Sequence, residues 1–140
     1  MTKLITIAVA YLLVANVQAQ NLQGKWSVEK VSIEKNTDGK VKKTVYKSAA
    51  EVKSYIPCPQ EWEVKDSKTI TLRYADGREE PAEYTMEGNQ LKIMTATAMQ
   101  LYQYSIKGKS LTLTTTHNYV NNLPTGHTER IEEKWTMVLK

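Results

Sequence analysis

Gly24-Lys25-Trp26 leads into the first predicted strand of this chain, and the segments that follow it decide the fold. From this point to the end of the chain, apolar residues recur at every second position in short segments. A period of two is typical of strands that bury one face and expose the other to solvent. The sequence therefore predicts an all-β domain.

Turn-forming residues separate these segments at close spacing. They stand at residues 36–39, 66–68, 76–77, 88–89 and 107–109. The strands predicted between them are 26–33, 41–46, 61–64, 69–74, 83–86, 91–95, 101–106, 111–116 and 130–139. A change of phase near Lys30 predicts a β-bulge in the first strand. The pattern thus supports eight strands and allows a short ninth.

Short connections between nearly all of these strands favour an up-and-down antiparallel barrel of about eight strands. A sandwich is the alternative, but sandwiches usually need Greek-key connections. Two connections are long. Residues 48–56 carry a weak helical pattern ended by Pro57 and are predicted to form a short helical or loop lid, and residues 118–128 are predicted to form a polar loop.

Residues 1–19 have the pattern of a secretory signal peptide. Lys3 precedes an apolar run, and Val17-Gln18-Ala19 has the small residues that a signal peptidase recognises, so we expect cleavage after Ala19. A membrane anchor is the alternative, but spanning a bilayer takes about 20 apolar residues and this run is shorter. We expect residues 20–140 to form one barrel domain, periplasmic or secreted, without a membrane anchor.

The charge balance is mildly basic, with 19 Lys and Arg against 15 Asp and Glu. This excess is too small and too dispersed to predict binding to nucleic acid or to anionic membranes. Cys58 is the one cysteine, so an internal disulfide is excluded. We expect its side chain to be a small buried apolar group, with a reactive thiol or an intermolecular bridge as the alternative. We expect a monomer.

On these residues the chain resembles the lipocalin-like (calycin) proteins, in particular the small exported bacterial type. The resemblance rests on Gly24-Lys25-Trp26, on the hairpins through Tyr74-Ala75-Asp76-Gly77 and Gly88-Asn89-Gln90-Leu91, and on the terminal strand around Glu133-Lys134-Trp135. It implies that Trp26 plugs the closed end of the barrel, with Arg130 or Lys134 over its ring as a cation–π partner. The chain departs from many animal members because it lacks both their Thr-Asp-Tyr turn and their disulfide.

The candidate ligand-binding residues lie on the middle and last strands. They are Leu72, Tyr74, Tyr84, Tyr102, Tyr104 and Trp135. A tyrosine inside a barrel offers an apolar ring and one hydroxyl, which suits an amphipathic ligand. The alternative is that these rings fill the barrel, because eight strands enclose little space.

The sequence contains no pattern that predicts catalysis. It has no Gly-x-Ser-x-Gly segment, and Cys58 has no evident histidine partner. Glu132 and Glu133 are adjacent and therefore point to opposite faces of a strand. Glu133 is in phase with apolar neighbours, so we expect it to face inward as the partner of a basic residue. His117 and His127 lack the further ligands of a zinc site, so no metal or cofactor is expected.

The sequence therefore predicts an exported, non-enzymatic barrel that binds a small lipophilic or amphipathic ligand in its cup. The alternative is a filled barrel that binds a protein partner through its rim loops, as calycin-fold protease inhibitors do. An enzyme built on the cup is a weaker third reading. The volume inside the barrel separates the first two functions. Ligand pockets measure about 300–1,000 Å³, whereas a core packed to ordinary density favours the protein partner.

Overall fold

A computed structural model of the chain describes residues 22–54 and 56–140. Within them, nine strands form one antiparallel sheet, and a single 3₁₀ turn, η1 (Ala49–Glu51), follows the second strand. The strands are β1 (Gly24–Thr37), β2 (Lys40–Tyr46), β3 (Glu61–Val64), β4 (Thr69–Arg73), β5 (Glu79–Glu87), β6 (Gln90–Met94), β7 (Met99–Lys107), β8 (Ser110–Asn122) and β9 (Thr128–Leu139). The predicted signal peptide and its cleavage site at Ala19 lie outside the described residues.

The sheet closes on itself because β1 pairs with other strands along both of its edges. Residues 24–27 pair with β3 on one edge, and residues 28–37 pair with β9 on the other. The ring β1-β3-β4-β5-β6-β7-β8-β9 is a closed eight-stranded antiparallel barrel, and β2 is an extra strand paired to the second half of β1. The predicted barrel is confirmed.

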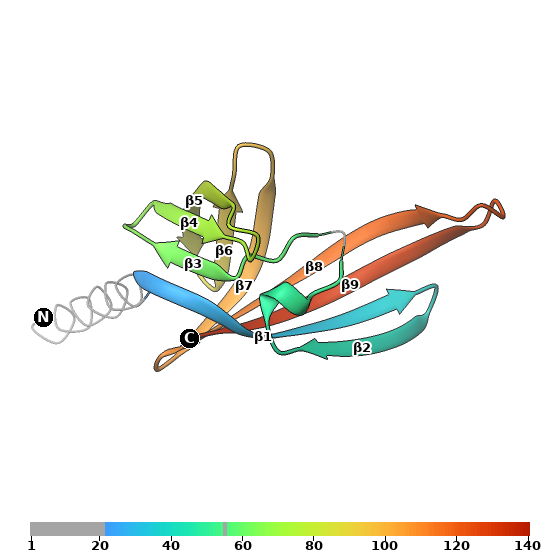
Figure 1. Cartoon of the computed structure of the whole chain (residues 1–140), viewed down its shortest axis with the longest axis horizontal. Coiled ribbons are helices and arrows are strands. Elements are labelled where there is room, and N and C mark those ends of the chain that lie inside the picture. Colours follow the sequence, from blue (N-terminus) through green and yellow to red (C-terminus); the bar gives the residue numbers. More distant parts are fainter. Residues whose placement is uncertain (1–21, 55) are drawn as a thin grey trace, which may run out of the picture.

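Four strands continue beyond the barrel as an extension that we call the arm. It is the sheet β2-β1-β9-β8, made of residues 40–46, 31–37, 128–135 and 115–122. In Figure 1 the arm runs to the right, past the shorter strands β3 to β7. Its two outer strands, β2 and β8, end the sheet on either side.

The prediction of a polar loop over residues 118–128 is wrong. β8 continues to Asn122 and β9 begins at Thr128, which leaves only a turn between them. The inward-facing positions in this part of β8 are His117, Tyr119 and Asn121. Because these side chains are polar or amphipathic, the apolar period of two stops after Leu113 although the strand continues.

The bulge predicted near Lys30 is confirmed by a shift in the β1–β9 register between Val28 and Lys30. The predicted turn before β2 is also present. Asp38 and Gly39 have φ values of 49° and 88°, which a two-residue hairpin turn of type I′ requires. The N–H of Asp38 donates to the Arg130 carbonyl (3.1 Å), and the N–H of Arg130 donates to Asp38 Oδ1 (3.1 Å). This turn is therefore joined to β9 at the far end of the arm.

Inward-facing side chains fill the barrel. Trp26, Trp62 and Trp135 are 7%, 1% and 2% exposed, and they pack with the aliphatic side chains of every barrel strand. Trp26 lies at the end of the barrel where the described chain begins, and its Nε1 donates to the Leu22 carbonyl (2.8 Å). The Trp62 ring packs edge-to-face against Tyr102, with centroids 5.4 Å apart.

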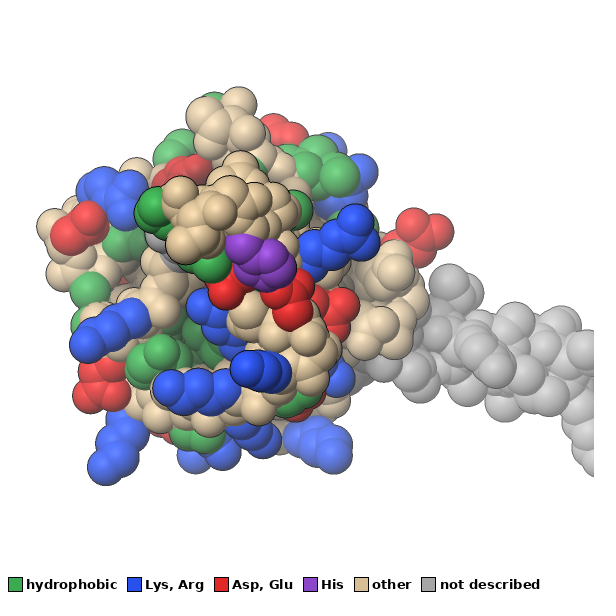
Figure 2. Space-filling view, turned by 90° about the vertical axis from the view of Figure 1, so that its right-hand side faces the viewer, with side chains coloured by type: hydrophobic (Ala, Val, Ile, Leu, Met, Phe, Trp, Pro, Cys, Tyr) green, Lys and Arg blue, Asp and Glu red, His purple; other side chains and the backbone are tan. Residues whose placement is uncertain are grey.

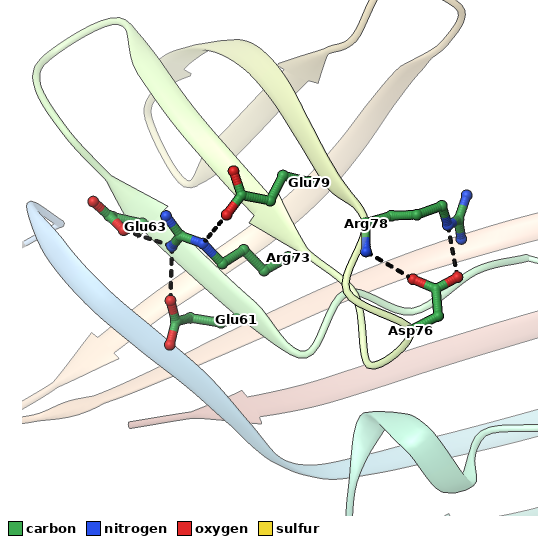
Figure 3. A network of polar contacts seen from close by, with 6 residues as sticks. All are labelled: Glu61, Glu63, Arg73, Asp76, Arg78 and Glu79. Atoms are coloured by element: carbon green, nitrogen blue, oxygen red, sulfur yellow. Dashed lines mark hydrogen bonds and ion pairs between the residues drawn. The ribbon is translucent and has the colours of Figure 1, made fainter.

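On the outer surface, Arg73 joins three neighbouring strands (Figure 3). Its guanidinium donates to Glu61 and Glu63 of β3 and to Glu79 of β5. The carboxylates raise the pKa of Arg73, and the hydrogen bond from Arg73 holds the pKa of Glu63 below its usual value. These ion pairs are partly solvated, so they add little to stability compared with the core.

We predict that Leu139→Ala lowers the free energy of unfolding by about 2–5 kcal/mol. Leu139 is fully buried and lies opposite both Val28 of β1 and Leu111 of β8, where the barrel closes. Val138→Ala is the matched control, because Val138 is the next residue and points outward. Urea unfolding followed by circular dichroism measures both. Equal losses in the two variants would contradict the closure of the barrel at β9.

Candidate functional site at the open end of the barrel

β7 and β8 separate part of the way along their length. Residues 103–107 pair with residues 110–114, and the pairing stops there. At that point Thr115 Oγ1 donates to the Leu101 carbonyl (2.8 Å) and accepts from Gln100 Nε2 (2.6 Å). Because side chains take the place of the next backbone bonds, the two strands diverge and the barrel is open at this end.

A hollow of about 550 Å³ lies in this opening. It is lined by the six consecutive β8 residues 116–121, together with Gln100 and Ile56. Consecutive residues of a strand point to opposite faces. A hollow that contacts six in a row must therefore run along the backbone edge of the strand. We call it the β8 slot.

The backbone groups that face the β8 slot can be assigned from the hydrogen bonds around it. Leu123 N–H donates to the His127 carbonyl (2.9 Å), which places the odd-numbered residues of this part of β8 in the ladder with β9. Alternation then directs the N–H and C=O groups of Thr116, Asn118 and Val120 away from β9. In the described part of the chain β8 neighbours only β7 and β9, and β7 has already diverged.

Glu133 of β9 lies next to His117 of β8 and is buried, with 4% of its surface exposed. Its carboxylate accepts hydrogen bonds from the Tyr119 hydroxyl (2.6 Å) and Trp135 Nε1 (2.8 Å), and from Ser54 Oγ (3.2 Å). Ser54 belongs to the segment predicted as a lid, so this contact ties that segment to the arm. The hydrogen-bonding partners of Glu133 are neutral, while Lys35 lies opposite it on β1.

Burial raises the pKa of Glu133, but the three hydrogen bonds and the charge of Lys35 together hold it below the usual value. Burial lowers the pKa of His117, although the nearby Glu133 acts in the opposite direction. The His117 ring packs edge-to-face on Trp135, with centroids 5.6 Å apart. Near neutral pH, an ionised Glu133 on β9 therefore lies beside the neutral imidazole of His117 on β8.

The six residues predicted to bind a ligand lie in the core of the barrel or pack against it. Leu72, Tyr84 and Trp135 are buried in the core. The hydroxyl of Tyr84 donates to the Asp66 carbonyl (2.6 Å), and that of Tyr104 donates to the Gly88 carbonyl (2.9 Å). Both of these hydroxyls are therefore occupied by the backbone of turns.

Tyr74 and Tyr102 are partly buried against the core. The Tyr74 hydroxyl donates to Glu80 (3.1 Å), and the Arg78 guanidinium lies 4.7 Å from the centre of its ring. Burial, followed by the charge of Glu80, raises the pKa of Tyr74 to about 12. Burial likewise raises the pKa of Tyr102. Both phenols are therefore protonated at neutral pH.

Neither basic residue expected over Trp26 is brought to it. Arg130 lies opposite Val120 near the tip of the arm, and Lys134 lies opposite Glu34. Trp26 is on the other side of the bulge, opposite Trp62 of β3. The arm carries the first part of β9 away from the closed end, which no local pattern in the sequence indicates.

Cys58 is half-buried, and burial raises the pKa of its thiol to about 12. The thiol donates to the Pro59 carbonyl (3.8 Å) and lies 3.9 Å from the Met137 sulfur. A protonated thiol is a weak nucleophile, so this setting fits the expected small buried side chain.

Among residues 22–54 and 56–140, no group of three or more His, Cys, Asp or Glu is placed to hold one metal ion. In the same residues no helix is long and apolar enough to cross a membrane.

Sequence reasoning did not single out Gln100 or Thr115, and it assigned residues 118–122 of β8 to a polar loop at the rim. One signal in the sequence pointed to this strand, because the thirteen residues of β8 include no charged side chain.

No protein-family model, curated protein or solved structure matches the chain. Its function is therefore inferred from this geometry.

We predict that Glu133→Gln lowers the free energy of unfolding by about 1–3 kcal/mol at neutral pH. An amide NH₂ would replace one acceptor oxygen and face a donor such as Tyr119. Because the folded-state pKa of Glu133 is lowered, its contribution is present above the ordinary value of 4.5 and is lost as the pH falls through the folded value. The variant should therefore lose less stability on acidification than the native protein.

Thermal unfolding measured from neutral pH to below pH 4.5 tests this. Glu132→Gln is the control, because Glu132 is the neighbouring residue and is exposed on the opposite face. Parallel stability curves for the native protein and Glu133→Gln would show that this carboxylate does not stabilise the arm.

Proposed function

We propose that this protein is a non-enzymatic binding module that takes an extended segment of a partner protein as an added strand on β8. The observation that carries the proposal is the β8 slot, which runs along the backbone of Thr116, Asn118 and Val120. In strand addition, hydrogen bonds between main chains supply affinity and alternate side chains supply specificity. This is the protein-binding alternative that the sequence leaves open.

The charges on the two free edges of the arm support β8 as the binding edge. Free edge strands are commonly protected from pairing by lysine. β2 carries Lys40, Lys42 and Lys43, whereas β8 has no charged residue. A partner strand would therefore meet electrostatic resistance at β2 and none from β8 itself.

The side chains around the β8 slot indicate what the partner segment would contain. One face of an added strand would meet Ile56 and Gln100 with the inward-facing Tyr119. Its other face would meet Val120, which is 58% exposed. The expected partner is therefore an extended segment with apolar residues at alternate positions and few charges.

The packing of the barrel weighs toward this function and away from a ligand in the cup. Leu72, Tyr84 and Trp135 contact other core side chains where the cup was expected. The hollow at the open end lies along a strand edge, outside this core. A packed interior is the condition under which the sequence favours a protein partner.

Asn118→Pro tests the proposal, because the N–H of Asn118 faces the β8 slot and is not part of the β8–β9 ladder. Proline at such an edge position removes a donor from an added strand while leaving the existing pairing in place. Random linear peptides displayed on phage are selected on the native protein. We predict alternating, weakly charged sequences whose affinity falls at least about tenfold on Asn118→Pro.

Val45→Pro is the matched control, since the Val45 backbone faces the free edge of β2. It should leave peptide affinity unchanged, and thermal unfolding should confirm that both variants fold. Failure to select any peptide, or equal binding to the native protein and Asn118→Pro, would contradict strand addition at β8. A native dimer that Asn118→Pro converts to monomer would identify the added strand as β8 of a second copy.

A further inference from the structure

The positive charge of this protein is concentrated on one side of the arm. Residues 30–53 contain seven lysines and three acidic residues, a balance of +4, and the net charge of the whole chain is also +4. The remaining sequence is therefore neutral overall. Residues 30–53 include β2 and most of β1, which pair as the β1–β2 hairpin at one edge of the arm.

The lysines of this hairpin lie close to one another without ion-pair partners. Lys40, Lys42 and Lys43 are exposed on β2, and Lys35 of β1 lies directly opposite Lys42. Like charges in this arrangement repel. None of these four lysines takes part in the ion pairs found among the described residues, although Glu34 lies opposite Lys43. Figure 2 shows Lys and Arg side chains gathered over the lower half of this end of the molecule.

Two large aliphatic side chains are exposed among these lysines. Val41 and Val45 of β2 are 60% and 54% exposed, and both share a face with Lys43. Lysines with aliphatic groups between them suit the interface of a membrane, where phosphates attract the charges and the acyl boundary accepts the apolar side chains.

We propose that the β1–β2 hairpin docks this protein on an anionic lipid surface. Lys40 and Lys42 project from one face of β2, and Val41, Lys43 and Val45 project from the other, so the hairpin would dock with the free edge of β2 toward the membrane. Side chains on both sides of that edge would then reach the surface, the lysines against lipid phosphates and the valines at the boundary between headgroups and acyl chains. Docking of this kind is reversible, and salt weakens it because mobile ions screen the charges. The proposal does not rest on strand addition, since β2 and β8 are opposite edges of the arm and the β8 slot stays open.

The same lysines also protect the free edge of β2 from pairing with other strands. If the lysines served only to protect the edge of β2, the protein would not need affinity for lipid, and Val41 and Val45 would not need to be exposed. Lipid binding and self-association must therefore be measured on the same variants.

The experiment uses vesicles of phosphatidylglycerol and phosphatidylcholine in about equal parts, compared with phosphatidylcholine alone, in a sedimentation assay. The full chain is expressed for every variant, so its N-terminal processing is the same throughout. The native protein should bind the anionic vesicles, and binding should fall steeply between about 0.05 M and about 0.5 M salt. The combined variant Lys40→Gln, Lys42→Gln, Lys43→Gln should bind at least about tenfold more weakly.

A matched control removes the same charge elsewhere, with Lys65→Gln, Lys107→Gln and Lys109→Gln combined. These lysines are exposed in other turns and at the end of β7, and their removal should change binding by less than about twofold. Val41→Ser with Val45→Ser should weaken binding by about threefold or more. If the hairpin variant self-associates, Lys42→Glu keeps the edge charged and should weaken vesicle binding instead.

Absence of native binding to the anionic vesicles would overturn the proposal. Equal losses in the hairpin variant and its control would do the same, because net charge alone would then explain the affinity. Peptide binding at β8 is unaffected by any of these substitutions, so failure here leaves strand addition standing.

Discussion

Every part of this structure depends on β1 pairing with other strands along both of its edges. One strand of fourteen residues joins β3, β9 and β2, and the bulge between Val28 and Lys30 divides the half that meets β3 from the half that forms the arm. Closure removes the edges of the barrel strands. Yet β1, β8 and β9 are far longer than β3 or β4, which have only four and five residues. The excess length continues as a four-stranded sheet, and that sheet has two free edges.

The two free edges of the arm differ in how far they are protected from pairing with another strand. β2 is protected by Lys40, Lys42 and Lys43, whereas β8 is uncharged and is bordered by a slot where Thr115 ends its pairing with β7. Between them, Glu133 fastens the arm to the segment that contains Ser54. The features on which the proposals rest thus lie on the arm and at the opening beside it, while apolar side chains occupy the interior of the barrel.

Much of the fold could be predicted because strand formation leaves a local signal. Alternation located the strands, the change of phase at Lys30 located the bulge, and Asp38-Gly39 located a hairpin turn. The outer half of β8 was missed because its inward side chains, such as His117, are not apolar. The separation of β7 from β8 depends on the hydrogen bond from the Thr115 hydroxyl to the Leu101 carbonyl. Alternation of apolar residues within one strand does not predict such a contact between two strands. The site was therefore less predictable than the fold.

Residue-resolved amide hydrogen exchange by NMR tests the free edge of β8 most directly. The N–H groups of His117 and Asn121 pair with β9 and should be protected, as should that of Thr112, which faces β7. Those of Thr116, Asn118 and Val120 should exchange much faster, so that protection alternates along the outer half of the strand. Uniform protection would mean that this edge is covered, and uniform fast exchange would mean that the arm does not form; either result contradicts the structure described here.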